Sequence, residues 1–254
     1  MSDKQKVAVI TGSASGIGLA LAAAALDRGM RVAITSRSGE KLTRARQQLG
    51  GAEDRLVDVV ADLRDTAQVD RLVDTVDGRF GRIDLWVNNA AGLFFAHAQD
   101  ITPNGWRAVV DATLNAPFLC CRAVFPVLER QTGGCILNIS SIAAYRPHPG
   151  AAHYAAAKAG LNSLTETLAA EWAPYGIRVV GVALGPVLTD ASRFHDPALR
   201  AAAEREQPTG RIPTGEEIAD VILALADITS PSFTGETVRV DGGFRSVLAN
   251  PLDS

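Results

Sequence analysis

The segment VAVITGSASGIG, residues 7–18, decides the fold, because a glycine-rich turn joins an apolar, β-branched run to the start of a helix pattern. Gly12 can take the tight turn, Gly16 lets backbone amides approach a phosphate, and Gly18 lets the helix pack closely on a sheet. An ordinary tight turn also uses glycine, but a strand before it and a helix after it favour binding of a dinucleotide at the helix start. The residues expected to hold its phosphates are Gly12, Ser15, Gly16, Ile17 and Gly18.

Outward from this segment, short β-branched runs alternate with longer stretches rich in Ala and Leu. The strands are predicted at residues 7–10, 31–35, 56–61, 85–88, 135–140, 178–183 and 236–241. The helices are predicted at residues 17–28, 40–49, 67–80, 105–114, 117–131, 153–174 and 215–226. This order predicts an α/β fold, a doubly wound seven-stranded parallel sheet of Rossmann type, in one domain over residues 1–254. The long irregular region 186–214 is expected to be a substrate lid.

Composition excludes several classes of partner. The 254 residues carry a formal net charge of −3 without a basic block, so we expect no nucleic acid partner. The apolar stretches are too short for a membrane span, and the start is unlike a signal peptide. Neither the three cysteines nor the four histidines stand in a metal-binding spacing, so no metal is expected. Free cysteines are typical of a reducing compartment, which predicts a cytoplasmic protein.

A second group of residues suggests acid and base chemistry. Tyr154 and Lys158 are four residues apart in a predicted helix, so their side chains share one face. A cation near a tyrosine stabilises the phenolate and lowers a pKa that is otherwise near ~10. Ser141 follows the fifth predicted strand, where a parallel sheet opens to ligands. A lone YxxxK pattern would be an ordinary helix face, but Ser141 and the nucleotide turn favour catalysis.

The end of the second predicted strand bears on cofactor choice. A site for NAD carries an acidic residue there, which binds the ribose 2′-hydroxyl. Here VAITSR places Ser36 at that position and Arg37 beside it. Ser36 can donate to a 2′-phosphate and Arg37 can pair with it, so we predict NADP(H); the alternative is that Arg37 is only a solvated loop charge.

These motifs together resemble the short-chain dehydrogenase/reductase family. The marks are TGSASGIG at 11–18, DL at 62–63, NNAAG at 88–92, Ser141, YAAAK at 154–158, GPVLT at 185–189 and TGETVRVDGG at 234–243. The resemblance implies an oxidoreductase in which Ser141 binds the substrate oxygen, Tyr154 gives or takes a proton, and Lys158 also holds the nicotinamide ribose. It implies that Asp62 contacts the adenine, that the turn after the fourth strand lines the nucleotide cleft, and that the region of Thr189 meets the nicotinamide amide. The cofactor residues added in this way are Asp62, Leu63, Asn89, Ala90, Tyr154, Lys158, Pro186, Val187 and Thr189.

One position departs from the family pattern. The family's usual catalytic asparagine is expected 41 residues before Tyr154, where this chain has Thr113. Asn115 cannot replace it, because two positions are about 200° around a helix. Thr113 could hold a water in the proton path, or the set could be incomplete. The doubled alanine in NNAAG is similar to the 2,4-dienoyl-CoA and enoyl-CoA reductase branch, so reduction of an enoyl thioester is the alternative to carbonyl chemistry. A binding protein that senses NADP without turnover is a third possibility.

The resemblance also implies the substrate pocket and the assembly. The pocket residues are expected to include Phe94, Ile142, His148 and His153, although solvated loop positions or buried core would also explain these side chains. Two predicted helices, near 116–127 and 154–170, are rich in Ala and Leu over much of their surface and need a further surface to pack on. Because the family pairs the equivalent helices between subunits, we expect a homo-oligomer, with a tetramer favoured.

Overall fold

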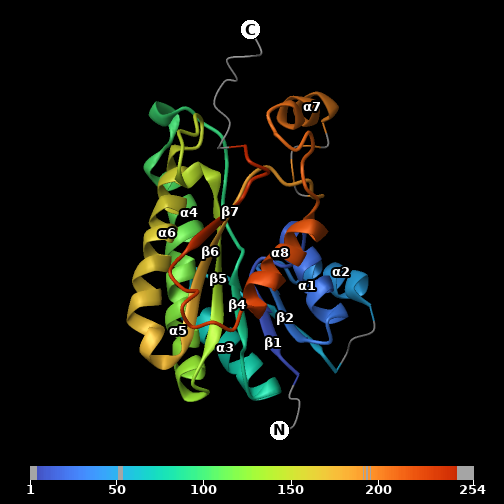
Figure 1. Ribbon diagram of the computed structural model, residues 1–254, viewed down its shortest axis with the longest axis vertical. Coiled ribbons are helices and arrows are strands. Elements are labelled where there is room, and N and C mark those ends of the chain that lie inside the picture. Colours follow the sequence, from blue (N-terminus) through green and yellow to red (C-terminus); the bar gives the residue numbers. More distant parts are fainter. Residues whose placement is uncertain (1–4, 51–53, 191, 193, 195, 245–254) are drawn as a thin grey trace.

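The computed structural model describes residues 5–50, 54–190, 192, 194 and 196–244. Its centre is a seven-stranded sheet in the order β3-β2-β1-β4-β5-β6-β7 (Figure 1), in which every neighbouring pair is parallel. The strands are β1 (Val7–Ile10), β2 (Arg31–Ser36), β3 (Leu56–Val60), β4 (Leu85–Asn88), β5 (Gly134–Ser141), β6 (Ile177–Leu184) and β7 (Thr237–Val240). The predicted fold class is therefore confirmed, and the strand order reverses between β1 and β4.

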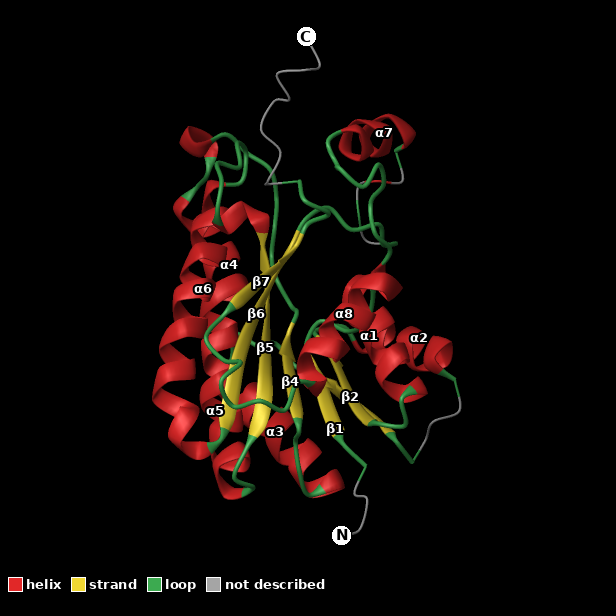
Figure 2. Cartoon of the chain, viewed as in Figure 1, coloured by secondary structure: helices red, strands yellow, loops and turns green. Residues whose placement is uncertain are grey.

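Helices cover both faces of the sheet (Figure 2). One layer contains α1 (Gly16–Asp27), α2 (Gly39–Leu49) and α8 (Gly215–Asp227). The other contains α3 (Thr66–Phe80), α4 (Pro103–Val110), α5 (Ala116–Arg130) and α6 (Ala152–Trp172). Both faces of the sheet are buried in this way, which explains why the strands read as nearly continuous apolar runs.

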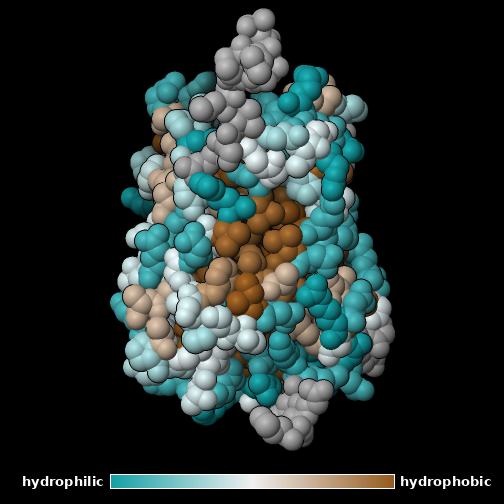
Figure 3. Space-filling model, viewed as in Figure 1, coloured by the Kyte–Doolittle hydropathy of each residue, from teal (hydrophilic) through white to brown (hydrophobic). Residues whose placement is uncertain are grey.

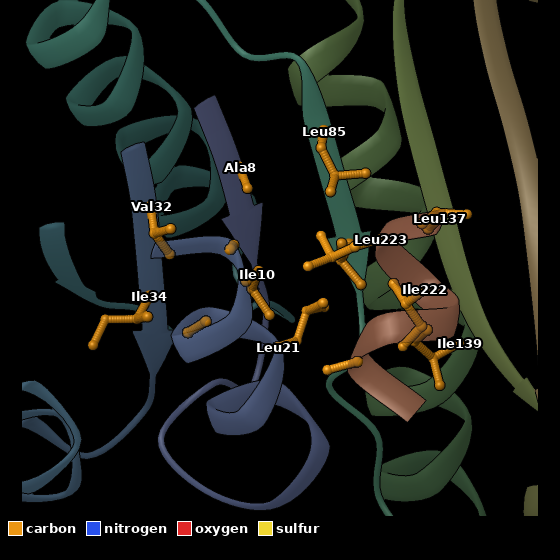
Figure 4. Close-up of a cluster of buried hydrophobic side chains, with 14 of the residues drawn as sticks. Ala8, Ile10, Leu21, Val32, Ile34, Leu85, Leu137, Ile139, Ile222 and Leu223 are labelled. Carbon is orange, nitrogen blue, oxygen red and sulfur yellow. The ribbon is translucent and has the colours of Figure 1, made fainter. Parts of the chain in front are cut away.

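The core divides into two clusters because side chains along a strand alternate between faces. In β1, Ala8 and Ile10 belong to the cluster under α1 and α8, whereas Val7 and Val9 belong to the cluster under α3 and α5. Figure 4 shows the first cluster, with Leu21 of α1 near Ile10. The three cysteines are buried and free; Cys135 lies in the first cluster, and Cys120 and Cys121 in the second.

The structure corrects the prediction of two separate helices at 105–114 and 117–131. A single helical stretch runs over Pro103–Arg130, and residues Asp111–Asn115 form a π-helical turn within it. The second predicted helix begins at Pro117. This proline has no N–H for the carbonyl of residue 113, and the wider turn before it lets the helix continue. The stretch is long and apolar enough to cross a membrane by length and composition alone, but its buried residues pack in the core of the sheet.

The predicted lid, residues 186–214, is not irregular throughout. It contains α7 (Pro197–Arg205), whose start is capped by Asp196 through bonds from Ala198 N and Leu199 N at 2.8 and 3.3 Å. None of the residues of α7 is buried, and Figure 1 shows the helix standing beyond the carboxyl ends of the strands.

Candidate active site

Thr11 fixes the carboxyl ends of β1 and β4 to each other, where the strand order reverses. Its hydroxyl donates to the carbonyl of Val87 at 3.0 Å and accepts the backbone N–H groups of Asn89 and Ala90 at 2.9 and 3.1 Å. The side chain of Asn89 donates to the carbonyls of Thr11 and Gly12 at 2.9 and 3.2 Å. The turns after β1 and β4 thus form one rigid rim, which is the position where open α/β sheets bind ligands.

The glycine-rich turn forms a cradle that a larger side chain would fill. Gly12 has φ +62°, and a Cβ there would lie 2.9 Å from Ala90 Cα. A Cβ at Gly18 would lie 2.6 Å from the carbonyl oxygen of Gly12, so α1 packs directly on the turn. Ser15 caps α1 without a side-chain hydrogen bond to its first turn. The helix start with its N–H groups therefore fits the phosphates of a dinucleotide.

A cavity of about 600 Å³ opens beside this rim. It brings together nine of the predicted residues: Gly12, Ser15, Ser36, Arg37, Asp62, Leu63, Asn89, Ala90 and Phe94. Gly16, Ile17 and Gly18 lie in the first turn of α1, outside the cavity lining. Among the residues that the structure describes, no group of three or more His, Cys, Asp or Glu side chains could hold a metal ion.

The cavity contains more positive charge than the sequence prediction included. Lys41 and Arg64 line it together with Arg37. Arg64 pairs with Asp62 at 2.6 Å, and this bond is the main reason that the pKa of Asp62 falls to about 2. The sequence did offer a signal for both missed cations, since Lys41 is in the first turn of the helix after Arg37 and Arg64 is two residues after Asp62.

The three predicted catalytic residues do lie together. Ser141 ends β5, and Tyr154 and Lys158 lie in the first two turns of α6, where the Tyr154 hydroxyl shares a hydrogen bond with Ser141. The ammonium nitrogen of Lys158 donates to the carbonyl of Ile139 at 2.5 Å and lies 5.5 Å from the centre of the Tyr154 ring.

Burial dominates the titration of this group. Desolvation raises the pKa of Tyr154 above its ordinary value, and the bond to Ser141 opposes this in part. Desolvation also lowers the pKa of Lys158 to about 7. Burial is thus the main influence on both pKa values, and stabilisation of the Tyr154 phenolate by Lys158 stays a prediction.

Thr113 lies in the π-helical turn and is fully buried. Its hydroxyl accepts the N–H of Gly92 at 3.1 Å and donates to the carbonyl of Gly92 at 3.2 Å. The hydroxyl thus ties this turn to the loop after β4, and a role for Thr113 in holding a water in the proton path stays a prediction. Asn115 bonds Asp111 at 2.7 Å, in agreement with the expectation that it does not replace Thr113.

Three of the predicted substrate residues, Phe94, His148 and His153, take part in aromatic ring contacts. The ring of Phe94 meets His153 edge to face at 4.4 Å between centroids, and Phe95 lies 6.2 Å from His148. His153 is fully buried, with Nδ1 accepting the N–H of Tyr154 at 2.9 Å, so the reading of a solvated loop histidine is wrong. Ile142 is also buried and begins a short 3-10 helix after Ser141.

The loop after β6 holds the remaining predicted cofactor residues. Val187 is buried in the first core cluster, which leaves its backbone as the part available to a cofactor. Thr189 and Pro186 are partly exposed. Leu188 pairs with Thr214, and its N–H donates to the carbonyl of Pro213 at 2.9 Å, so the two ends of the predicted lid lie side by side.

Comparisons with known proteins agree with this geometry. Residues 12–245 match the family described as Enoyl-(acyl carrier protein) reductase. The chain is 40% identical to 3beta-hydroxysteroid dehydrogenase 1 of Eggerthella lenta over 94% of each chain. It is 36% identical to a probable 2,4-dienoyl-CoA reductase of Bacillus subtilis, over 94% of this chain and 96% of that protein.

A solved structure of a short chain dehydrogenase from Bacillus anthracis superposes with a TM-score of 0.88 at 36% identity, covering 98% of this chain and 99% of that one. These matches extend over nearly the whole chain and include both the cofactor end and the Ser141, Tyr154 and Lys158 group. The chain is therefore an oxidoreductase of the short-chain dehydrogenase/reductase family, whose members use a nicotinamide cofactor.

Proposed function

We propose that this protein is an NADPH-dependent reductase of carbonyl compounds, with Tyr154 as the proton donor. The observation that carries this proposal is the side-chain hydrogen bond between Tyr154 and Ser141, two half-buried residues next to Lys158. A phenol whose pKa is raised by burial is protonated at neutral pH, as reduction of a carbonyl requires. Oxidation of an alcohol would instead need the phenolate at the start.

The bound nicotinamide supplies the hydride, and the chain's own residues manage the oxygen of the substrate. Ser141 donates to that oxygen and orients it toward Tyr154, which releases its proton to the same atom. The resulting phenolate favours the charged form of Lys158, whose pKa near 7 lets it take up a proton at neutral pH. Phe94 and His153, whose rings meet edge to face, are proposed to line the substrate pocket together with Ile142 and His148.

The choice of NADP(H) over NAD(H) is supported by charge. Ser36, Arg37 and Lys41 line the cavity at the end of β2, with no acidic residue at the position that would bind a ribose 2′-hydroxyl. A 2′-phosphate would meet two cations there, Arg37 and Lys41, whereas an adenosine without it would bring no charge for them to bind. The Asp62 carboxylate, held ionised by Arg64, is proposed to contact the adenine.

The test is consumption of NADPH by the purified protein against a panel of ketones and enoyl-CoA thioesters, with Tyr154→Phe as the matched variant. We expect turnover of ketones that falls about 100-fold or more in Tyr154→Phe, because a general acid contributes roughly that much. The variant should still bind NADPH, because the Tyr154 hydroxyl is only one of the contacts expected to hold the cofactor.

Reduction of an enoyl thioester is the second candidate. It is favoured by the description of the matching family and by the dienoyl-CoA reductase relative. Turnover of enoyl-CoA with Tyr154→Phe still active would establish it in place of the carbonyl proposal. Binding of NADPH without turnover of either class would favour the sensor.

Three further properties are proposed. Region 186–214 acts as a substrate lid, supported by the exposed helix α7 between two ends that lie side by side. The protein is a cytoplasmic homotetramer, supported by its free buried cysteines and by exposed aromatic side chains on the α5 and α6 layer, Phe118 and Tyr175. Figure 3 also shows a hydrophobic area in the middle of the viewed face, framed by hydrophilic residues.

A further inference from the structure

Helix α6 carries two of the three proposed catalytic residues, yet the side chains around them are too small to interlock with the neighbouring strands. Its sequence begins AHYAAAKAGLNSL, in which alanine and glycine dominate the turns around Tyr154 and Lys158. Side chains this small form shallow ridges, and packing of ridges into grooves is what normally fixes a helix against its neighbour. The apolar contacts alone therefore leave the position of α6 along β5 weakly specified.

Buried pairs of hydrogen-bonded polar side chains fix the position of α6 along β5. The hydroxyl of Ser140 on β5 donates to the side-chain oxygen of Asn162 on α6 at 2.5 Å. Two residues earlier on the strand, Asn138 donates to the hydroxyl of Thr165 at 2.9 Å. All four residues are buried, and alternate strand positions meet successive turns of the helix.

The polar contacts continue into the middle of the sheet. Asn88 of β4 donates to the side-chain oxygen of Asn138 at 2.8 Å and accepts the indole N–H of Trp86 at 2.8 Å. Asn88 and Asn138 are also direct partners in the β4 and β5 register. Hydrogen bonds thus connect α6 through β5 to β4, and the turn after β4 forms part of the rim at which we expect the cofactor to bind.

We propose that Ser140 and Asn162 are positioning residues that set the register of α6 on β5, and through it the meeting of Tyr154 with Ser141. The place of the pair supports this role. Ser140 directly precedes Ser141, and Asn162 lies one turn after Lys158 and two turns after Tyr154 on the same face of the helix. The pair therefore links the two halves of the catalytic group, and a displacement of about 1 Å at such a group is enough to slow a reaction about 100-fold.

A pair that only held the fold together would behave differently. Replacing both members of a buried polar pair by apolar groups of similar size is often neutral or favourable for stability, whereas register depends on the direction of the bond. Stability and catalysis are therefore expected to separate when the pair is removed as a unit.

The experiment compares Ser140→Thr with Ser140→Val, because threonine and valine have the same shape and differ only in the hydroxyl. A double variant, Ser140→Val/Asn162→Leu, removes both members of the pair. Thr167→Val is the matched control, because its hydroxyl bonds the carbonyl of Ser163 on the exposed side of the same helix at 3.0 Å. The measurements are the melting temperature, the Kd for NADPH, kcat and KM, and the absorbance titration of Tyr154, taken as the difference from each variant with Tyr154→Phe.

We expect Ser140→Thr and Thr167→Val to keep kcat within about threefold. Relative to Ser140→Thr, which carries the same added methyl group, the double variant should lose about 10-fold or more in kcat at an unchanged melting temperature and NADPH Kd. Tyr154 should titrate at a higher pH there, because its bond to Ser141 lowers its pKa. The inference is overturned if the double variant keeps kcat and the titration of Tyr154, or if every loss follows the melting temperature. It rests on the proposed role of Tyr154, but the titration needs no substrate, so failure of the proposed reaction and failure of the register role give different results.

Discussion

Thr113 and Gly92 bind each other twice, since the threonine hydroxyl accepts the glycine N–H at 3.1 Å and donates to the glycine carbonyl at 3.2 Å. One side chain thereby connects the π-helical turn to the loop that follows β4. Gly92 also lines the nucleotide cavity, so the tie acts on the wall of the site. Position 113 therefore has a structural role, which the comparison with the family's usual asparagine did not predict.

The first prediction concerns that tie. Thr113→Val keeps the shape but leaves both Gly92 groups without this partner, and should cost about 1–3 kcal/mol in the free energy of unfolding. Thr113→Ser keeps the hydroxyl and should lose less than half of that. Denaturant titration measures both, and equal losses in the two variants would show that the hydroxyl carries no weight. Thr113→Asn, whose amide can also donate and accept, should retain turnover within about tenfold.

The second prediction uses two glycines in helices. Gly18→Ala places a methyl group 2.6 Å from the carbonyl oxygen of Gly12, so it should destabilise the fold by about 1–3 kcal/mol and weaken NADPH binding. Gly78→Ala, inside α3, meets no heavy atom within 4 Å and should stabilise the fold by about 0.5–1 kcal/mol. Thermal melts give both values, and the same sign for both would contradict the close packing of α1 on the turn.

The third prediction is for cofactor choice. Arg37→Ala should weaken the Kd for NADPH about 10- to 100-fold and that for NADH less than threefold, because only NADPH carries the 2′-phosphate. The control is Arg44→Ala, because Arg44 lies in α2, just after Arg37 in the chain, and pairs with Glu40 outside the cavity lining. A parallel loss for both cofactors would mean that Arg37 acts on the adenine half in general. A wild-type preference for NADH would reject the proposal itself.

The fourth prediction is a pH dependence of stability. Burial lowers the pKa of Lys158 from 10.5 to about 7, so between these values the unfolded chain holds a proton that the folded chain lacks. Stability from this site therefore rises with pH above about 7, by at most about 1.4 kcal/mol per pH unit. The difference in unfolding free energy between wild type and Lys158→Met, measured from pH 7 to 9, should increase with pH. A flat difference would indicate that the buried amine stays charged.

The fifth prediction concerns assembly. Light scattering of the purified protein should give the mass of a tetramer, and a monomer would refute the proposal. Phe118→Glu should reduce the mass, because the ring is 46% exposed on α5 and a charge there opposes burial against a second copy. Glu129→Gln, at the far end of the same helix, should leave the mass unchanged.

Much of the fold was predictable because its signals are local. The apolar periodicity, the β-branched runs and the glycines at helix ends located all seven strands. The glycine-rich turn and the turn after β4 meet where the strand order reverses, as expected for such a sheet. The helix through Pro117 was not predictable, because a proline inside a helix is normally a stop and the π-helical turn that accommodates it depends on packing. The burial of His153 against Phe94 was also hidden, since it joins residues far apart in the chain.

The buried cysteines make the two layers of the molecule separately observable. Burial raises the pKa of Cys121 to about 12 and that of Cys135 to about 11, so neither forms the reactive thiolate at neutral pH while its layer stays closed. Alkylation of Cys135 therefore measures opening of the layer under α1 and α8, and alkylation of Cys120 or Cys121 measures opening of the layer under α3 and α5. Equal labelling rates would mean that the two faces of the sheet unfold as one cooperative unit. A faster rate at one site would show which half of the molecule opens first.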